Sequence, residues 1–115
     1  MNDQIPSRIA TRIVKMILQS KENESNYKYD ISFLGYTYKP NIADMRESPA
    51  KLIIDSIKNL NFRTFEYDPL VDLKFKERDV LQNLHQSKMI ILLVEHESLK
   101  EICKKVNYIH WRELI

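Results

Sequence analysis

One short stretch of the sequence, residues 36–47, gathers side chains that could bind an anion. Lys39 would bind a phosphate group as a point charge, whereas the guanidinium group of Arg46 can donate to two oxygens at once. Tyr38 lies beside Lys39 and adds an aromatic ring with a hydroxyl group. These residue types indicate a binding site for a phosphorylated ligand.

The residues that follow support this interpretation, but an ordinary loop would explain the same composition. Ser48 and Pro49 are typical of the first residues of a helix, and the amino end of a helix attracts anions. In the alternative, the stretch is a solvated loop in which the lysine and the arginine merely pair with Asp44 and Glu47.

Three further side chains are weaker candidates. Asp68 ends a predicted strand, where dinucleotide-binding folds place an acid on a ribose, but the pair Asp68-Pro69 is more typical of a plain turn. His96, between Glu95 and Glu97, could act as an acid or base, but no nucleophile neighbours it in the sequence, and we expect a surface histidine near the start of a helix. Cys103 falls on the apolar face of a predicted helix and is expected to be a buried small hydrophobe. The histidines and Cys103 show no metal-ligand spacing, so we expect no metal site.

Hydrophobic periodicity predicts strands that alternate with helices. Ile9, Ile13 and Ile17 repeat every fourth residue, as on one face of a helix. The unbroken apolar run Met89–Val94 is typical of a strand that is buried on both faces of a parallel sheet. The predicted helices are 6–20, 48–60, 75–84 and 99–106, and the predicted strands are 30–35, 62–67, 89–94 and 108–109. The pattern favours an α/β fold with a parallel sheet covered on both sides.

Composition excludes several classes of protein. The 115 residues include 18 Lys and Arg against 16 Asp and Glu, too even a balance for a nucleic-acid binder recognisable by charge. Gly35 is the single glycine, which excludes glycine-rich phosphate loops. No apolar run approaches the roughly 20 residues of a membrane span, and the single cysteine excludes an internal disulfide. We expect a reduced, cytoplasmic domain that binds neither membranes nor nucleic acids.

The order of residues in the loop resembles a known family signature. Residues 34–50 read L-G-Y-T-Y-K-P-N-I-A-D-M-R-E-S-P-A. This resembles the pattern L-G-x-x-[FY]-K-x-x-x-x-D-x-R-[ED]-S of the UDP-glucose/GDP-mannose (nucleotide-sugar) 6-dehydrogenase family, at the start of its C-terminal UDP-binding domain. Residues 66–71 and 87–99 resemble later segments of that domain, and residues 2–17 resemble the end of the helix that joins it to the central domain.

The resemblance implies a fold, a reaction and site residues. It implies a Rossmann-like parallel sheet of about four strands, preceded by a linker helix. Family members oxidise the C6 alcohol of a nucleotide sugar to a carboxylate in two NAD-dependent steps. Tyr38 and Lys39 would contact the UDP-sugar, and Arg46 would reach toward NAD. Cys103 matches no catalytic position of the family, and the catalytic and NAD-binding segments belong to domains that are absent here.

Two departures from the family pattern affect these expectations. Ala43 replaces the first of two acids that many relatives carry before the arginine, whereas Asp44 keeps the second. The resemblance also places a terminal strand with a D-x-R motif beyond Ile115, so one arginine that contacts the substrate is expected to be missing.

We therefore interpret residues 1–29 as the end of an inter-domain helix with a polar linker, and residues 30–115 as a UDP-binding domain. Its parent would be an NAD-dependent UDP-sugar 6-dehydrogenase of polysaccharide biosynthesis, acting on UDP-glucose, UDP-N-acetylglucosamine or UDP-N-acetylmannosamine and assembling as a homo-oligomer such as a dimer. The chain alone should be inactive. The alternative is a truncated, non-catalytic interaction module that assembles through the apolar face of helix 6–20.

Overall fold

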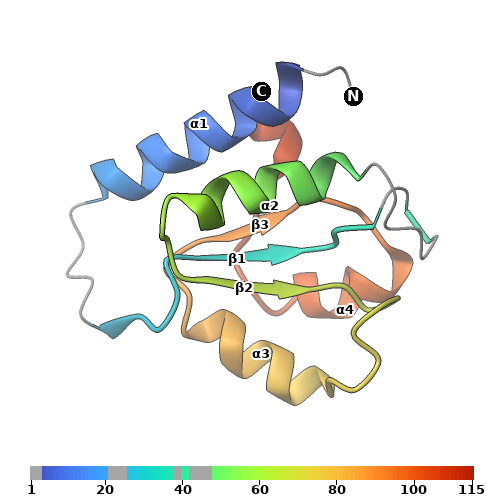
Figure 1. Ribbon diagram of the computed structural model, residues 1–115. Coiled ribbons are helices and arrows are strands. Elements are labelled where there is room, and N and C mark those ends of the chain that lie inside the picture. Colours follow the sequence, from blue (N-terminus) through green and yellow to red (C-terminus); the bar gives the residue numbers. More distant parts are fainter. Residues whose placement is uncertain (1–3, 21–25, 38–39, 42–47) are drawn as a thin grey trace.

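The computed structural model describes residues 4–20, 26–37, 40–41 and 48–115. In this part of the chain, four parallel strands form one sheet in the order β2-β1-β3-β4 (Figure 1). The strands are β1 (Ile31–Leu34), β2 (Thr64–Tyr67), β3 (Ile90–Leu92) and β4 (Ile109–His110). The helices are α1 (Gln4–Gln19), α2 (Pro49–Asn59), α3 (Glu77–His85) and α4 (Lys100–Cys103), with short 3-10 helices η2 (Glu97–Leu99) and η3 (Trp111–Leu114). The predicted α/β class and the four-stranded parallel sheet are confirmed.

The sheet separates two hydrophobic cores. One core joins the sheet to α1, α2 and η3, and the other joins it to α3 and α4. Successive side chains of a strand point to opposite faces. Accordingly, Phe33 of β1 and Ile91 of β3 enter the first core, whereas Leu34 and Leu92 enter the second. Every residue of β1 and β3 is buried, and β3 lies between β1 and β4. A central strand is therefore confirmed within the predicted run Met89–Val94, but it is limited to Ile90–Leu92.

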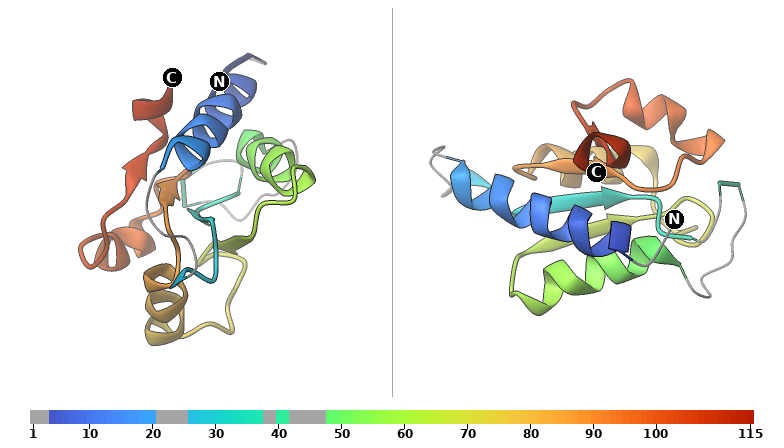
Figure 2. Two further views of the ribbon diagram at one scale, coloured as in Figure 1. Left: turned by 90° about the vertical axis from the view of Figure 1, so that its left-hand side faces the viewer. Right: turned by 90° about the horizontal axis from the view of Figure 1, so that it is seen from above.

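The apolar face of α1 is buried within the chain itself. Ile9 and Ile13 have no exposed surface and Ile17 has 4%. They pack in the first core, where α1 runs beside α2 and meets η3 (Figure 2). The hypothesis that the chain assembles through the apolar face of helix 6–20 is therefore wrong, because the chain's own first core already covers this face.

Two of the predicted helices have different boundaries in the structure. Phe75 was expected in the third helix but precedes α3, since its ring packs edge-on against Phe65 and Tyr67 at centroid distances of 5.8 and 5.9 Å. The helix predicted over 99–106 is a 3-10 turn followed by the four-residue α4. No helix in the described ranges is long and apolar enough to cross a bilayer.

Gly35 ends β1 at a point where no other residue fits. Its φ is +80°, and a Cβ atom there would lie 2.3 Å from the carbonyl oxygen of Val94. The loop that leaves β1 therefore passes directly against the turn that leaves β3. This close approach brings the carboxyl ends of the two central strands together.

Replacing this glycine should destabilise the fold strongly. We expect Gly35→Ala to lower the free energy of unfolding by about 3 kcal/mol or more, because a backbone clash adds to the strain of a positive φ. Urea unfolding followed by circular dichroism measures the loss. Asn61→Ala is the matched control, since Asn61 also has a positive φ, +66°, but is exposed. Equal losses in the two variants would contradict a clash at Gly35.

Candidate functional site

The strand order creates a crevice at the carboxyl edge of the sheet. The chain leaves β1 through α2 toward β2 and leaves β3 through α4 toward β4, so the two connections diverge. Open α/β sheets bind ligands at such a point. A hollow of about 340 Å³ opens here. It is lined by Thr37, Pro40, Pro49, Ala50, Ile53, Leu93, Val94, Glu95, Trp111 and Arg112.

The rim of the crevice carries an aromatic ring and a cation. The guanidinium carbon of Arg112 lies 5.4 Å from the centroid of the Trp111 ring. The imidazole of His110 stacks on the same ring at a centroid distance of 5.8 Å. An aromatic face beside a guanidinium group suits a ligand that joins a planar base to an anion. Arg112 was not anticipated, because the resemblance placed the family's C-terminal arginine beyond Ile115.

His110 fixes the turn that presents Trp111 and Arg112. Its Nδ1 accepts a hydrogen bond from the backbone N–H of Arg112 at 3.1 Å. Its own backbone N–H donates to Oε2 of Glu113 at 2.7 Å, which completes a capping box at η3. Nε2 of His110 is hydrogen-bonded to Oε1 of Glu95. The ends of β3 and β4 are thus tied together on one side of the crevice.

A fully buried polar cluster joins the ends of β1, β2 and β3 beside the crevice. Asp68 and Thr37 have no exposed surface and His96 has 2%. Nε2 of His96 lies 2.8 Å from Oδ2 of Asp68 and 2.8 Å from Oγ1 of Thr37. The Thr37 hydroxyl donates to the same carboxylate oxygen at 3.2 Å. Each of these residues follows a different strand, so the cluster fixes three loops at once.

Backbone amides complete the environment of Asp68. Oδ2 accepts from the N–H groups of Tyr36 at 2.8 Å and Thr37 at 3.1 Å, and Oδ1 accepts from Leu70 at 2.9 Å. Burial alone would raise the pKa of Asp68, but the hydrogen bonds from Tyr36, Leu70 and His96 outweigh it and hold that pKa below its usual value. Asp68 is therefore a buried carboxylate anion.

The start of α2 is anchored to the same loop. Ser48 caps the helix by accepting from the N–H of Lys51 at 3.4 Å, as its sequence predicted, and its hydroxyl donates to the carbonyl of Tyr36 at 2.7 Å. The Tyr36 hydroxyl donates to Oδ2 of Asp72 at 2.7 Å. Burial, followed by this hydrogen bond, raises the pKa of Tyr36 well above its usual value. Tyr36 is therefore a structural residue in its neutral form.

The predicted ligand-binding residues stay predictions. Tyr38, Lys39 and Arg46 lie outside the described residues. Two described residues of the same stretch of sequence, Thr37 and Pro40, line the crevice. Among the residues that the structure describes, no group of three or more His, Cys, Asp or Glu side chains could hold a metal ion.

His96 was predicted to be a surface residue, and this is wrong. After β3 the chain makes a tight turn, in which the backbone N–H of His96 donates to the carbonyl of Val94 at 3.0 Å. Glu95 and Glu97 are exposed, whereas Val94 and His96 are buried. The exposure of both neighbours therefore does not extend to His96, because its imidazole reaches inward to Asp68.

Asp68 was predicted to be a plain turn residue, which describes only part of its role. Its Oδ1 does accept from Leu70 in a local turn, but Oδ2 organises the loop after β1. The sequence did contain a signal for this wider role. Asp68 and His96 both lie just after predicted strands, and the carboxyl ends of parallel strands meet at one edge of the sheet. Cys103 is half-buried against the second core, and burial raises the pKa of its thiol, as expected for an unreactive residue.

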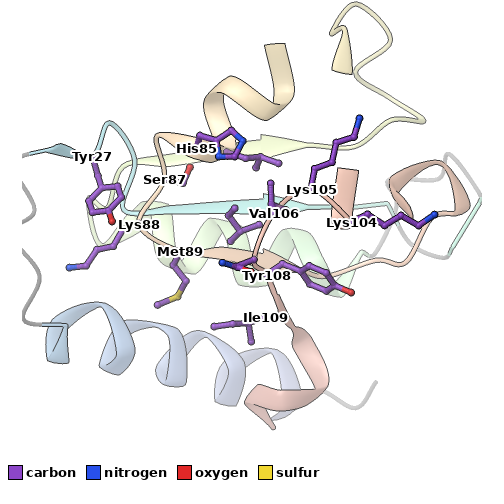
Figure 3. A pocket seen from close by; sticks show the side chains of 13 residues that line it. Tyr27, His85, Ser87, Lys88, Met89, Lys104, Lys105, Val106, Tyr108 and Ile109 are labelled. Carbon is purple, nitrogen blue, oxygen red and sulfur yellow. The ribbon is translucent and has the colours of Figure 1, made fainter. Parts of the chain in front are cut away.

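A larger hollow, of about 640 Å³, lies at the opposite edge of the sheet, where β3 and β4 begin (Figure 3). Lys104 and Lys105 line it and pair with Glu101 at 3.2 Å and Glu77 at 3.1 Å. Both α3 and α4 end beside it, and cations near helix C-termini balance the helix dipole. These lysines are therefore explained without a ligand, and the crevice remains the better candidate site.

Comparison with known proteins agrees with the fold. The family model described as "UDP-glucose/GDP-mannose dehydrogenase family, UDP binding domain" matches residues 32–113. A UDP-N-acetyl-D-mannosamine dehydrogenase of Methanococcus vannielii is 28% identical over 106 residues, covering 91% of this chain and 24% of the relative. A UDP-glucose 6-dehydrogenase of Rhizobium meliloti is 44% identical over 39 residues, covering 34% of this chain and 9% of the relative.

A solved structure shows the same fold. The UDP-N-acetyl-mannosamine dehydrogenase Cap5O from S. aureus matches with a TM-score of 0.69 and 21% identity, over 92% of this chain and 30% of that one. An α/β domain with its crevice at the strand switch point is a nucleotide-binding type of fold. The chain belongs to the UDP-glucose/GDP-mannose dehydrogenase family and corresponds to its UDP-binding domain. It spans about a quarter of the length of the M. vannielii relative.

The buried carboxylate should make stability depend on pH. We expect Asp68→Asn to lower the free energy of unfolding by about 1.5–3 kcal/mol near pH 7, because charge-assisted hydrogen bonds are lost. The folded-state pKa of Asp68 lies below its unfolded value, so this stabilisation is present above about pH 4 and is lost as pH falls through the lowered folded pKa.

Urea unfolding of both proteins between pH 7 and pH 3 measures the difference, which should shrink as the pH falls. Asp55→Asn, at an exposed position of α2, is the control and should change the free energy of unfolding by less than about 0.5 kcal/mol. A difference that is independent of pH would contradict an ionised Asp68.

Proposed function

We propose that this chain binds the UDP portion of a UDP-sugar in the crevice between the carboxyl ends of β1 and β3. The observation that carries the proposal is the position of Trp111 and Arg112 on the rim of the switch-point crevice. The family match to a UDP-binding domain supports the identity of the nucleotide. The volume of about 340 Å³ falls within the usual range of small-molecule sites.

The described residues supply what a nucleoside diphosphate needs. Trp111 offers an aromatic face to a planar base, and Arg112 offers two donors to phosphate oxygens. The first turn of α2 also lines the crevice through Pro49 and Ala50, and the amino end of a helix favours an anion. The chain thus replaces a glycine-rich cradle with side chains and a helix start.

The activity of the parent protein follows as a further proposal. We propose that this domain is part of a UDP-sugar 6-dehydrogenase, in which the C6 alcohol is oxidised to a carboxylate while NAD accepts the electrons in two steps. Relatives that match along most of the chain carry the name UDP-N-acetyl-D-mannosamine dehydrogenase. This favours an N-acetylhexosamine over glucose as the sugar.

NAD does not fit the residues described here. A dinucleotide loop needs several glycines, whereas Gly35 is the single glycine of the sequence and is used for close packing against Val94. Of this chain's residues, only Arg46 is proposed to reach the cofactor. The chain by itself is therefore proposed to bind nucleotide without catalysing the oxidation.

Three proposals rest on family membership rather than on contacts of this chain. They are that the parent assembles as a homo-oligomer such as a dimer, that it works in the cytoplasm, and that it supplies a sugar acid for polysaccharide biosynthesis. A single half-buried cysteine is compatible with a reducing compartment.

The crevice can be tested by titrating the chain with UDP in a calorimeter. We expect Arg112→Ala to weaken binding by about 1.5–3 kcal/mol, since a donor to a charged phosphate is lost. Arg78→Ala removes an exposed arginine of α3, on the other face of the sheet, and should leave the affinity unchanged. Equal affinities of both variants and the wild type would overturn the crevice as the UDP site.

The loop residues predicted from the resemblance should differ from each other. Lys39→Ala should weaken UDP binding by about 1.5–3 kcal/mol if its ammonium group contacts the diphosphate. Arg46→Ala should leave UDP affinity within about twofold, because Arg46 is assigned to NAD. The same calorimetric titration measures both. Negligible effects of both substitutions would favour the alternative of a solvated loop.

A further inference from the structure

His96 is held at both ring nitrogens inside the protein. Nδ1 accepts a hydrogen bond from the backbone N–H of Asn41 at 2.7 Å, so this nitrogen carries no proton. The proton of the neutral ring therefore sits on Nε2, which faces Asp68 and Thr37, each at 2.8 Å. The buried cluster thus fixes one tautomer and aims an acceptor at Asn41.

Asn41 is connected to the turn after β3 in two ways. Besides its N–H bond to His96, its Oδ1 accepts from the backbone N–H of Glu97 at 2.8 Å. Its φ is +64°, in the left-handed region that asparagine adopts more readily than most other residues. Pro40, the preceding residue, is exposed and lines the crevice. The position of this wall therefore depends on what holds Asn41.

We propose that His96 is a positioning residue for nucleotide binding: its unprotonated Nδ1 holds Asn41, and through it the Pro40 wall of the crevice. The inference rests on the proposed function, because it assumes that the crevice binds UDP. His96 does not line the crevice and acts only through the backbone of Asn41.

The physical consequence is a change in the competent fraction of the site. Without the acceptor, the N–H of Asn41 would bond to water, and the exposed turn would sample other conformations. The apparent Kd then equals the intrinsic Kd divided by the fraction of molecules whose site is competent to bind. The second bond, from Glu97 to the side chain of Asn41, retains part of the constraint, so we expect a moderate loss of affinity.

Two amide substitutions separate positioning from folding. The side-chain oxygen of asparagine reaches the place of Nδ1, so His96→Asn keeps an acceptor for Asn41 but loses the donor to Asp68. The side-chain amide of glutamine reaches the place of Nε2, so His96→Gln keeps the donor to Asp68 but loses the acceptor.

The experiment measures three quantities on the wild-type chain and both variants: UDP affinity by calorimetry, hydrogen exchange of the Asn41 amide by NMR, and stability by urea unfolding. We expect His96→Asn to be the less stable variant, with affinity within about twofold of the wild type and a protected Asn41 amide. We expect His96→Gln to be the more stable variant, with a Kd raised about fivefold to tenfold and faster Asn41 exchange.

The outcomes distinguish the inference from the proposed function. If the less stable of the two variants is also the one that binds UDP more weakly, His96 is merely structural and the inference is overturned. If the wild-type chain does not bind UDP at all, the proposed function fails. Should neither variant fold, the nitrogen spectrum of 15N-labelled histidine in the wild-type chain decides: an unprotonated Nδ1 at His96 supports the inference, and a protonated one overturns it.

Discussion

The carboxylate of Asp68 is the interaction on which the carboxyl edge of the sheet depends. A buried charge is costly unless donors surround it, and here the loop after β1, the turn after β2 and the imidazole after β3 all supply donors. Three segments that are far apart in the sequence must therefore converge on one oxygen pair. Within the described ranges, no buried side-chain nitrogen or oxygen lacks a hydrogen-bond partner. The cluster is thus fully satisfied, and it stabilises the loops that lie beside the crevice.

Two neighbouring residues after β3 serve the two sides of the crevice. Glu95 is hydrogen-bonded to His110, which holds the turn of Trp111, whereas the imidazole of His96 meets Asp68. The close approach of Gly35 to Val94 fixes how far apart the two sides lie. A strand end therefore organises both walls without contributing a catalytic group of its own.

This arrangement explains how the domain can bind a nucleotide without a glycine-rich loop. Glycine cradles present backbone N–H groups to phosphate, whereas here the Tyr36 and Thr37 N–H groups are occupied by Asp68. In the proposed function, anion recognition falls to Arg112, the start of α2 and the predicted Lys39. The packing of α1 on α2 and η3 also means that the helix preceding the domain is part of its core.

The sequence by itself determined the elements and the family. The spacing of Ile9, Ile13 and Ile17 and the apolar run before Glu95 depend on local periodicity, which is visible along one chain. The ordered motif of residues 34–50 identified the family without any structure. What the sequence did not determine was which polar residues meet: Asp68 and His96 lie 28 positions apart and were each interpreted from their immediate neighbours. Only the strand order brings them to one edge, and only the packing of α1 and η3 shows that the apolar helix face is covered and that Arg112 reaches the crevice.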